Sequence, residues 1–464
     1  MAEKFLHYVK DKKHELVSTV HEHISSMTDT TGTLAKQKLL QKLITSGVLK
    51  SEHIRQALQI GIGYFLDDQL DRPKTLNEYT QRVKFPTCGS ILTPSHNLPD
   101  FDIEAYGIDL FYTLMNIYDI QPTTLRSHIC QGELREIVNP SSSGSLLYLT
   151  SDALFLIKTV RDYDAKFIQQ KFLNEYCQYV TSTPATFIAK LFGCFGYIPY
   201  LSQQKGITVD SFTLRFAIFS NFIPTNIVIH EKYDLKGSSY KRDASATEKQ
   251  KTSATFKDND FRDIHPEGLT LPKSVYYLLK DVITRDVEFL QKLNVMDYSL
   301  LLTVHNMDNQ VKPTRIGTLE SLISNARDAF LVGMAQQVDQ LDEEKSKTPL
   351  KFKNPMETLG VGHKEMSTFD AENAKKIGGI PAINEKGEWV LLFFGIIDIL
   401  QTFDICKVMQ RQYQTVENPD VVDDRSIVET DFYADRFKKF VFERVFRPAE
   451  DELCTHPMSM NAFS

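Results

Sequence analysis

Hydrophobic and polar residues follow two different spacings along this chain. In residues 1–50, the apolar residues between 39 and 44 recur at helical spacing among charged ones, which predicts an amphipathic helix packed on the main body or on a partner subunit. From 146 to 160, apolar residues alternate on either side of the turn-forming pair Ser151 and Asp152. This alternation predicts a β-hairpin preceded by a loop of small residues.

The rest of the chain predicts one further strand, a long helix and a segment of mixed character. The strand covers 212–222 and ends just before Pro224. The helix covers Lys273–Val295, because its apolar residues fall on one face after a proline start signal. Residues 307–388 mix charged, polar and glycine residues with a single helical stretch. We expect most of that segment to be a mobile insertion.

Composition places the chain among globular proteins with a sizeable core. Of its 464 residues, 42% are hydrophobic and 24% are charged, which is typical of folded domains. That length allows two to three structural units, or one large two-lobed enzyme with appendages. The net charge of −7 argues against binding of nucleic acid through the field of the whole molecule. Any basic contact must therefore come from a local face.

Neither the cysteines nor the apolar segments indicate export or membrane insertion. The six cysteines form no CxxC pair, so neither a zinc ribbon nor a disulfide framework is indicated, and a reducing, cytoplasmic setting fits best. The N-terminus lacks the apolar core of a signal peptide, and Ala2 stands where N-myristoylation requires glycine. The longest apolar run, Trp389–Leu400, is too short to span a bilayer. We therefore expect any membrane contact to be peripheral.

The first half of the chain contains two features that fit phosphoryl transfer from ATP. This reaction needs a loop of small residues over the phosphates, a lysine that binds them, and two carboxylates. Small side chains over Asn139–Ser145 would let backbone N–H groups approach phosphate oxygens, although a plain hairpin turn explains the same loop. Lys158 follows on the predicted apolar strand. It either faces an anionic partner or lies on an exposed edge.

The second half of the chain adds one lysine and two aspartates. Lys236 precedes Gly237 in a turn rich in hydrogen-bond donors, which a solvated basic turn would also explain. Asp297 and Asp398 interrupt apolar runs, where an ionised carboxylate must be paired, hydrogen-bonded or functional. A metal ion or another cation would compensate the charge of Asp398. Two such acids downstream of a lysine-bearing hairpin favour a phosphotransferase site.

Three strings resemble signatures of the phosphatidylinositol phosphate kinase family. They are DLKGS at Asp234–Ser238, MDYSLL at Met296–Leu301 and GIIDILQ at Gly395–Gln401, and the resemblance extends from Ile54 to Phe440. The strings SYKR, GGIPA and YADRF are similar to the type I subfamily, which phosphorylates phosphatidylinositol 4-phosphate at the 5-position. The string TFKDNDF is similar to type II. A protein kinase is the least favoured reading, because HRD, DFG and APE strings are missing.

The resemblance implies an α/β (α+β) fold of two lobes, distantly similar to protein kinases. Each lobe would contain an antiparallel sheet, with ATP bound between them. The implied domains are a helical extension over 1–50, an N-lobe over 51–222 and a C-lobe over 223–464 that contains the insertion. The implied cofactors are ATP and Mg²⁺.

The resemblance also implies roles for individual residues. Lys158 is similar to the ATP lysine, Lys236 to the lysine that reaches the transferring phosphate, and Asp297 to the catalytic aspartate at the inositol hydroxyl. Asp398 is similar to the magnesium ligand, and Asn221 ends the segment that would meet adenine. In the phosphate loop, contacts with ATP are implied for Asn139, Ser143, Gly144 and Ser145.

Three positions depart from the family pattern. Ser141 replaces a glycine of the phosphate loop, which removes backbone freedom and predicts weaker nucleotide binding. Lys166 stands where a second acid is expected, so Asp164 would have to pair with Lys158. Gln410 replaces a glutamate that is linked to substrate choice in type I members. Two alternatives therefore stay open, a type II-like kinase acting on phosphatidylinositol 5-phosphate and a phosphoinositide-binding scaffold with little or no catalysis.

The expected partner is an inositol phospholipid in the cytosolic leaflet, with the plasma membrane as the expected location. A homodimer is also expected, and nucleic acid is not. The segment 404–431 is rich in acids, so an anionic leaflet should repel it. A basic face is therefore expected elsewhere on the surface, formed by Lys232, Lys241, Arg242, Arg436, Lys438 and Lys439.

Overall fold

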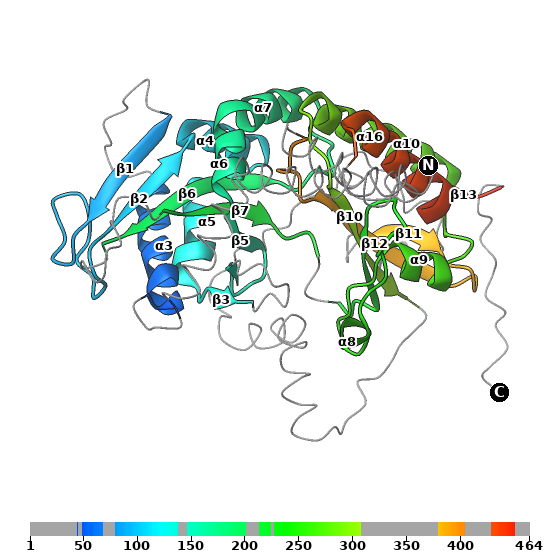
Figure 1. Ribbon diagram of the computed structural model, residues 1–464, viewed down its shortest axis with the longest axis horizontal. Coiled ribbons are helices and arrows are strands. Elements are labelled where there is room, and N and C mark those ends of the chain that lie inside the picture. Colours follow the sequence, from blue (N-terminus) through cyan, green and yellow to red (C-terminus); the bar gives the residue numbers. More distant parts are fainter. Residues whose placement is uncertain are drawn as a thin grey trace, which may run out of the picture. The chain divides into compact units, whose positions relative to one another are not determined.

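The computed structural model shows two compact units (Figure 1). The first holds the described residues up to 182, those from 189 to 221, and Phe403, and the second holds 183–188 and the described residues from 222 to 402 and from 428 onward. The main division falls between Asn221 and Phe222, one residue before the boundary implied by the resemblance. The structure describes residues 44, 49–67, 79–137, 146–200, 213–223, 227–307, 379–403 and 428–450.

The first unit is built on a seven-stranded sheet with the order β1-β2-β6-β7-β5-β4-β3. Every neighbouring pair in it is antiparallel. Residues of β6, inside the sheet, are buried at every position, whereas β1 at the edge alternates between exposed and half-buried positions and ends on the buried Phe85. The strands are β1 (Thr80–Phe85), β2 (Phe101–Tyr106), β3 (Arg135–Glu136), β4 (Leu147–Leu149), β5 (Phe155–Val160), β6 (Leu191–Pro199) and β7 (Leu214–Ser220).

Helices pack on this sheet through small and apolar residues (Figure 1). Gly61 of α3 allows the closest approach, because a Cβ atom at this position would lie 2.3 Å from Cγ1 of Ile103 on β2. Apart from Ile44, which is helical, and residues 49–50, the helix predicted over the first 50 residues lies outside the described residues. The helices are α3 (Ser51–Phe65), α4 (Ile108–Ile117), α5 (Pro122–Arg126), η1 (Ser127–Gln131), α6 (Asp162–Phe167), η2 (Ile168–Phe172) and α7 (Leu173–Ser182).

The hairpin predicted around Ser151 and Asp152 is confirmed as β4 and β5. Its turn is closed by hydrogen bonds to the Asp152 side chain, whose Oδ1 accepts from the Thr150 hydroxyl at 2.6 Å and from the Leu154 N–H at 3.0 Å. An aspartate that binds neighbouring polar groups in this way favours a turn over a continuous strand. The local sequence therefore determines this hairpin.

The second unit contains a six-stranded sheet with the order β13-β9-β11-β12-β10-β8. Its neighbouring pairs are antiparallel except β9 and β13, which pair in parallel. The mixed α/β fold with antiparallel sheets that the resemblance implied is confirmed. The strands are β8 (Glu231–Leu235), β9 (Leu269–Leu271), β10 (Ser299–Asn306), β11 (Ile380–Ile383), β12 (Trp389–Ile397) and β13 (Phe446–Pro448).

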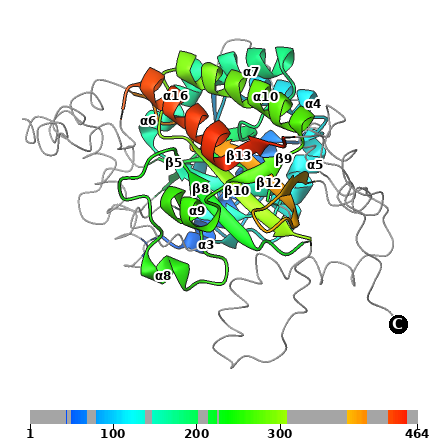
Figure 2. The ribbon, with the colours of Figure 1, turned by 90° about the vertical axis from the view of Figure 1, so that its right-hand side faces the viewer.

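Two helices, α10 and α16, lie side by side in this unit (Figure 2). The predicted helix at Lys273–Val295 is confirmed as α10, although it ends at Lys292 because the chain turns at Asn294 with a left-handed φ of 59°. Asp286 of α10 holds the segment 183–188, accepting from the Thr186 hydroxyl at 2.6 Å. The helices are α8 (Ala246–Lys249), α9 (Asp258–Ile264), α10 (Lys273–Lys292), α16 (Thr430–Phe440) and η5 (Val441–Val445).

The expected insertion over 307–388 needs a correction at its C-terminal end. Residues 380–383 form β11, which pairs with β12, and a tight turn over 384–388 joins the two strands. Asn384 closes that turn, because its side-chain oxygen accepts from the Lys386 and Glu388 N–H groups at 3.0 Å each. The polar residues that suggested an insertion therefore form a hairpin turn. Residues 308–378 lie outside the described residues.

Candidate active site

Three of the residues singled out from the sequence lie next to one another in the fold, each at the same end of one of three neighbouring strands. In the second unit, β8 and β12 both pair antiparallel with β10. The end of β8, the beginning of β10 and the end of β12 therefore lie side by side, at the same end of the three strands. Lys236 directly follows β8, Asp297 precedes β10 by two residues, and Asp398 directly follows β12. Residues far apart in sequence are thus brought together by strand register.

The Lys236 ammonium group binds Asp297 in two ways. Its Nζ donates to Oδ1 of Asp297 at 2.6 Å and to the carbonyl oxygen of the same residue at 2.8 Å. Burial of Lys236 lowers the pKa of the ammonium group, but Asp297, Asp234 and Asp398 outweigh this effect and raise it above its usual value. Lys236 is therefore positively charged at neutral pH. The sequence left open a solvated basic turn, whereas Lys236 is only 9% exposed.

Both aspartates have an unusual backbone conformation. The φ angle is 62° at Asp297 and 59° at Asp398, in the left-handed region that side chains other than glycine rarely adopt. Asp tolerates it better than most residues, yet it carries a conformational cost that often marks functional positions. At Asp398 the chain leaves the strand and begins a turn.

The exposure of the two aspartates corrects an expectation from the sequence. The apolar residues around Asp398 suggested a buried carboxylate, but Asp398 is exposed and the Asp297 side chain is 24% exposed. The reason is that β12 ends at Ile397. The turn that follows buries Ile399 and Leu400 and directs Asp398 to solvent. An apolar sequence therefore surrounds an aspartate that ligands can reach.

Gly237 lets the turn after Lys236 pack closely on α16. Its φ is 77°, and a Cβ atom at this position would lie 3.1 Å from the carbonyl oxygen of Arg436 and 3.2 Å from Cβ of Phe440. An alanine would be strained by both the backbone conformation and these contacts. The glycine of the DLKGS string is therefore required by the path of the backbone next to Lys236.

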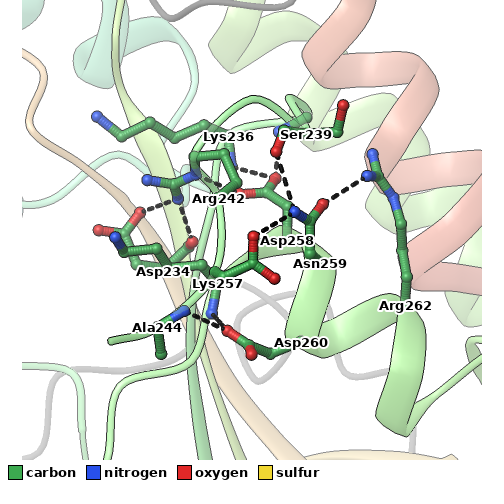
Figure 3. Close-up of polar contacts among 12 residues, drawn as sticks. Asp234, Lys236, Ser239, Arg242, Ala244, Lys257, Asp258, Asn259, Asp260 and Arg262 are labelled. Carbon is green, nitrogen blue, oxygen red and sulfur yellow. Dashed lines mark hydrogen bonds and ion pairs between the residues drawn. The ribbon is translucent and has the colours of Figure 1, made fainter. Parts of the chain in front are cut away.

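A buried carboxylate that the sequence did not single out organises the same turn. Asp258, the first residue of α9, is fully buried and binds Lys236, Gly237 and Arg242 (Figure 3). In the sequence it belongs to TFKDNDF, a string that indicates similarity to type II members and no role at the site. The signal that could have found it is the pair of acids in the first turn of what proves to be α9, since carboxylates at a helix start bind backbone N–H groups.

Arg242 does not belong to the exposed basic face that was expected. It is 9% exposed, and its guanidinium group binds Oδ2 of Asp258 at 2.6 Å and Oδ1 of Asp234 at 3.1 Å. Burial lowers the pKa of Arg242, but the two aspartates outweigh this effect and raise it. The basic string SYKR suggested a surface patch because sequence alone does not show that two acids, at 234 and 258, lie around the arginine.

The other residues of the expected basic face differ in exposure. Lys241 and Lys439 are exposed. Lys438 is half-buried and pairs with Asp435 on the same helix at 3.1 Å. Arg436 is also half-buried, with its guanidinium carbon 5.2 Å from the ring centroid of Tyr433. Lys232 of β8 is half-buried as well. Lys241 and Lys439 are thus the two members of this set that the structure leaves exposed.

In the first unit, Lys158 lies on an internal strand. It pairs with Leu147 of β4 on one side and with Ala217 of β7 on the other, and its side chain is half-buried. The alternative of an exposed edge strand is therefore wrong. Asn221 lies just beyond β7, where its side-chain amide donates to the carbonyl oxygen of Ala153 at 2.7 Å. This bond ties the end of β7 to the β4–β5 turn.

The helix after Lys158 contains the acid that was expected to pair with it. The buried Asp164 instead binds Arg161 at the start of α6, with Nε at 3.0 Å from Oδ2 and Nη2 at 2.7 Å from Oδ1. Lys166 is exposed. The remaining predicted residues lie outside the described residues, namely Gln410 and the phosphate loop with Asn139, Ser141, Ser143, Gly144 and Ser145.

Comparison with known proteins identifies the family. The family model described as phosphatidylinositol-4-phosphate 5-kinase matches residues 128–444. The chain belongs to this family. It is 36% identical over 404 residues to phosphatidylinositol 4-phosphate 5-kinase type-1 beta of Rattus norvegicus, which covers 86% of this chain and 69% of that relative. It is 34% identical over 415 residues to the type-1 alpha protein of Mus musculus, covering 88% and 68% of the two chains.

Family membership confirms the resemblance seen in the sequence. This member of the phosphatidylinositol-4-phosphate 5-kinase family is also 32% identical over 480 residues to the type-1 protein sktl of Drosophila melanogaster, which covers 93% of this chain and 58% of that relative. The matched region contains Lys158, Lys236, Asp297 and Asp398. As a kinase of this family, the protein is expected to use ATP.

The described residues contain neither a metal site formed by protein side chains alone nor a membrane-spanning helix. They contain no group of three or more His, Cys, Asp or Glu that could hold a metal ion alone. Mg²⁺ in kinases, however, is usually held by one or two carboxylates together with phosphates. Asp398, an exposed carboxylate directly after β12, fits a site of that kind. No helix among the described residues is long and apolar enough to cross a membrane.

Proposed function

We propose that this protein is a lipid kinase that transfers the γ-phosphate of ATP to the 5-hydroxyl of phosphatidylinositol 4-phosphate, giving phosphatidylinositol 4,5-bisphosphate. The observation that carries the proposal is the ion pair between Lys236 and Asp297, which lies at the same end of the strands as Asp398. The relatives named type-1 phosphatidylinositol 4-phosphate 5-kinases support the choice of substrate.

In this mechanism the described residues of the second unit act on the attacking hydroxyl and on the phosphate. Asp297 orients the inositol 5-hydroxyl and accepts its proton as the oxygen attacks the γ-phosphorus. The bond between that phosphorus and the bridging oxygen breaks, and ADP leaves. Lys236 places its positive charge where negative charge develops on the transferred phosphoryl group.

Contacts with ATP are proposed for individual residues around Lys158. Lys158, Asn139, Ser143, Gly144 and Ser145 would bind the phosphates, and Asn221 would end the segment that meets adenine. Asp398 would hold Mg²⁺ together with the phosphates of ATP, and the bound ion would neutralise charge on those phosphates.

The protein would act as a peripheral enzyme on the cytosolic leaflet, with the plasma membrane as its location and a homodimer as its assembly. Lys241 and Lys439 are exposed, and each basic residue near an anionic leaflet contributes about 1 kcal/mol of attraction. We assign these two lysines to the membrane-facing surface. Arg436 and Lys438 are half-buried and secondary.

A second candidate is a kinase that phosphorylates phosphatidylinositol 5-phosphate at the 4-position, which Gln410 favours because it departs from the type I pattern. Purified protein should be incubated with labelled ATP and vesicles containing each monophosphorylated inositol lipid. We expect the fastest labelling with the 4-phosphate. Faster labelling of the 5-phosphate would support the second candidate. Binding of vesicles without labelling would support a scaffold instead.

A further inference from the structure

Asp258 is a fully buried carboxylate whose hydrogen bonds go to the turn that carries Lys236. Its Oδ1 accepts from the Lys236 N–H at 2.8 Å and from the Gly237 N–H at 2.6 Å, and its Oδ2 accepts from Nε of Arg242 at 2.6 Å (Figure 3). Its exposure is 0%. A buried carboxylate is strongly unfavourable unless such donors surround it. Asp258 is therefore held in one orientation.

Lys236 is thereby fixed at both of its ends. Its backbone N–H is bound by Asp258, and its ammonium group is bound by Asp297. A lysine side chain has several rotatable bonds, so the position of its backbone decides how far the ammonium group can reach. The bond from Asp258 to the next N–H, at Gly237, also fixes the left-handed turn that begins there.

Arg242 closes the arrangement from the other side of the turn. Its guanidinium group joins Asp258 to the side chain and the backbone carbonyl of Asp234, two residues before Lys236. The segment from Asp234 to Arg242 is therefore a closed loop with Asp258 at its centre. Displacement of the Asp258 carboxylate would release the backbone on both sides of Lys236.

We propose that Asp258 is a positioning residue for phosphoryl transfer, whose carboxylate fixes the backbone at Lys236 and Gly237 so that the lysine ammonium group meets Asp297. This inference rests on the proposed role of Lys236 in the lipid kinase reaction. Asp258 itself touches neither substrate nor ATP. Its effect on the reaction passes through Lys236.

The first test is the variant Asp258→Asn in the full-length protein. The amide keeps the volume and one acceptor oxygen, but its NH₂ group cannot accept from Arg242. We expect kcat for lipid phosphorylation to fall about 10- to 100-fold, since small displacements of a catalytic group cost that much. The KM for ATP should change by less than about twofold, because the loss concerns the transition state.

Asp260→Asn is the matched control. Asp260 lies on the same helix, is 3% exposed, and likewise accepts from backbone N–H groups, those of Ala244 at 2.7 Å and Lys257 at 3.0 Å. Its partners are Lys257 directly before α9, Ala244 in the loop before α8 (Figure 3) and the Lys249 ammonium group of α8, and none of these contacts involves Lys236. We expect kcat to stay within about twofold. An equal loss of kcat in both variants would overturn the proposal and assign Asp258 to general stability of α9.

A measurement without catalysis separates this inference from the proposed function. The acetylation rate of the Lys236 amine by an N-hydroxysuccinimide ester is followed by mass spectrometry. We expect acetylation at least about threefold faster in Asp258→Asn than in the wild type and Asp260→Asn, because local opening exposes the amine. An unchanged rate would overturn the positioning role. A wild-type protein without kinase activity would contradict the proposed function instead.

A double variant tests whether Asp258 acts through Lys236. In a Lys236→Met background, Asp258→Asn should cause less than about a twofold further loss of residual kcat, because the group that it positions is already gone. A full further loss would contradict the proposal. If Asp258→Asn does not fold, Arg242→Lys replaces it, since this variant keeps the positive charge but loses the Nε bond to Asp258. The same pattern of kcat and acetylation is then expected.

Discussion

Lys236 and Asp297 form a close ion pair in which the lysine nitrogen lies 2.6 Å from one carboxylate oxygen and 2.8 Å from the backbone carbonyl of the same residue. Because of the hydrogen bond to the carbonyl oxygen, the position of the Lys236 ammonium group depends on the backbone of Asp297 as well as on its charge. Asp297 accepts both bonds while its backbone has a left-handed φ of 62°. The two residues proposed to act on the hydroxyl and on the phosphate are thus positioned by each other.

Replacement of Asp297 by asparagine should affect both members of this pair. The neutral amide cannot accept the proton of the hydroxyl, so we expect lipid phosphorylation to fall by about 10²- to 10⁴-fold. Asp297 is also the main cause that raises the pKa of Lys236 against the effect of burial, so the pKa of Lys236 should fall. The pH dependence of Lys236 acetylation measures this shift. Unchanged acetylation at every pH would contradict the pairing.

Asp398→Asn should abolish lipid phosphorylation and leave the stability of the protein nearly unchanged. The asparagine lacks the charge proposed to hold Mg²⁺, which corresponds to a loss of about 10³-fold or more. Asp398 is exposed, so its replacement should not disturb the core. Asp281→Asn, at an exposed acid on α10, is the control and should be fully active. Thermal unfolding and vesicle kinase assays check both points, and substantial turnover in Asp398→Asn would remove Asp398 from the site.

Lys158→Met should weaken ATP-dependent activity by about 10²- to 10³-fold, because one positive charge on the phosphates is lost. The methionine keeps most of the apolar contacts on the internal strand β5, so the sheet should stay intact. Binding of a fluorescent ATP analogue gives the affinity, and circular dichroism gives the fold. An unchanged rate would argue that Lys158 has only a structural role.

Arg242 and Lys241 are neighbours in sequence that should behave differently. Arg242→Met leaves the buried Asp258 without its cation, so we expect a loss of about 3–5 kcal/mol in the free energy of unfolding. Replacement of the exposed Lys241 should leave the free energy of unfolding unchanged.

The double variant Lys241→Glu and Lys439→Glu should instead reduce activity on anionic vesicles by about fivefold for each residue. Added salt should reduce wild-type activity in the same way. Equal losses on a soluble short-chain substrate would contradict a membrane-facing role.

His265 should make stability depend on pH. It is 2% exposed, and its two ring nitrogens lie 2.7 Å from Glu231 and 2.8 Å from Glu385. Burial lowers the pKa of His265, but Glu231 and then Glu385 outweigh that effect and raise it above its usual value. Its contribution to stability is thus complete below the unfolded pKa of about 6.5 and is lost as pH rises through the folded pKa. Between pH 6 and 9, the midpoint temperature of thermal unfolding should fall more steeply for the wild type than for His265→Gln. Parallel curves would contradict this prediction.

Several features of this protein followed from the sequence because they depend on residues close together in the chain. The β4–β5 hairpin follows from alternating apolar residues around Asp152, whose side chain closes the turn. Helix α10 follows from a single apolar face after Pro272. The candidate residues Lys236, Asp297 and Asp398 followed from short strings and from acids placed in apolar runs.

Other features were decided only by tertiary structure, because they depend on strand register and burial. Lys236 and Asp297 are 61 residues apart, and they meet because β8 and β10 pair with a particular register. Arg242 looked like surface charge until the fold placed Asp258 beside it, and Asp398 looked buried until β12 ended one residue before it. A local pattern specifies the conformation of a segment, whereas the partner of a charged side chain is set by segments that fold against it from elsewhere in the chain.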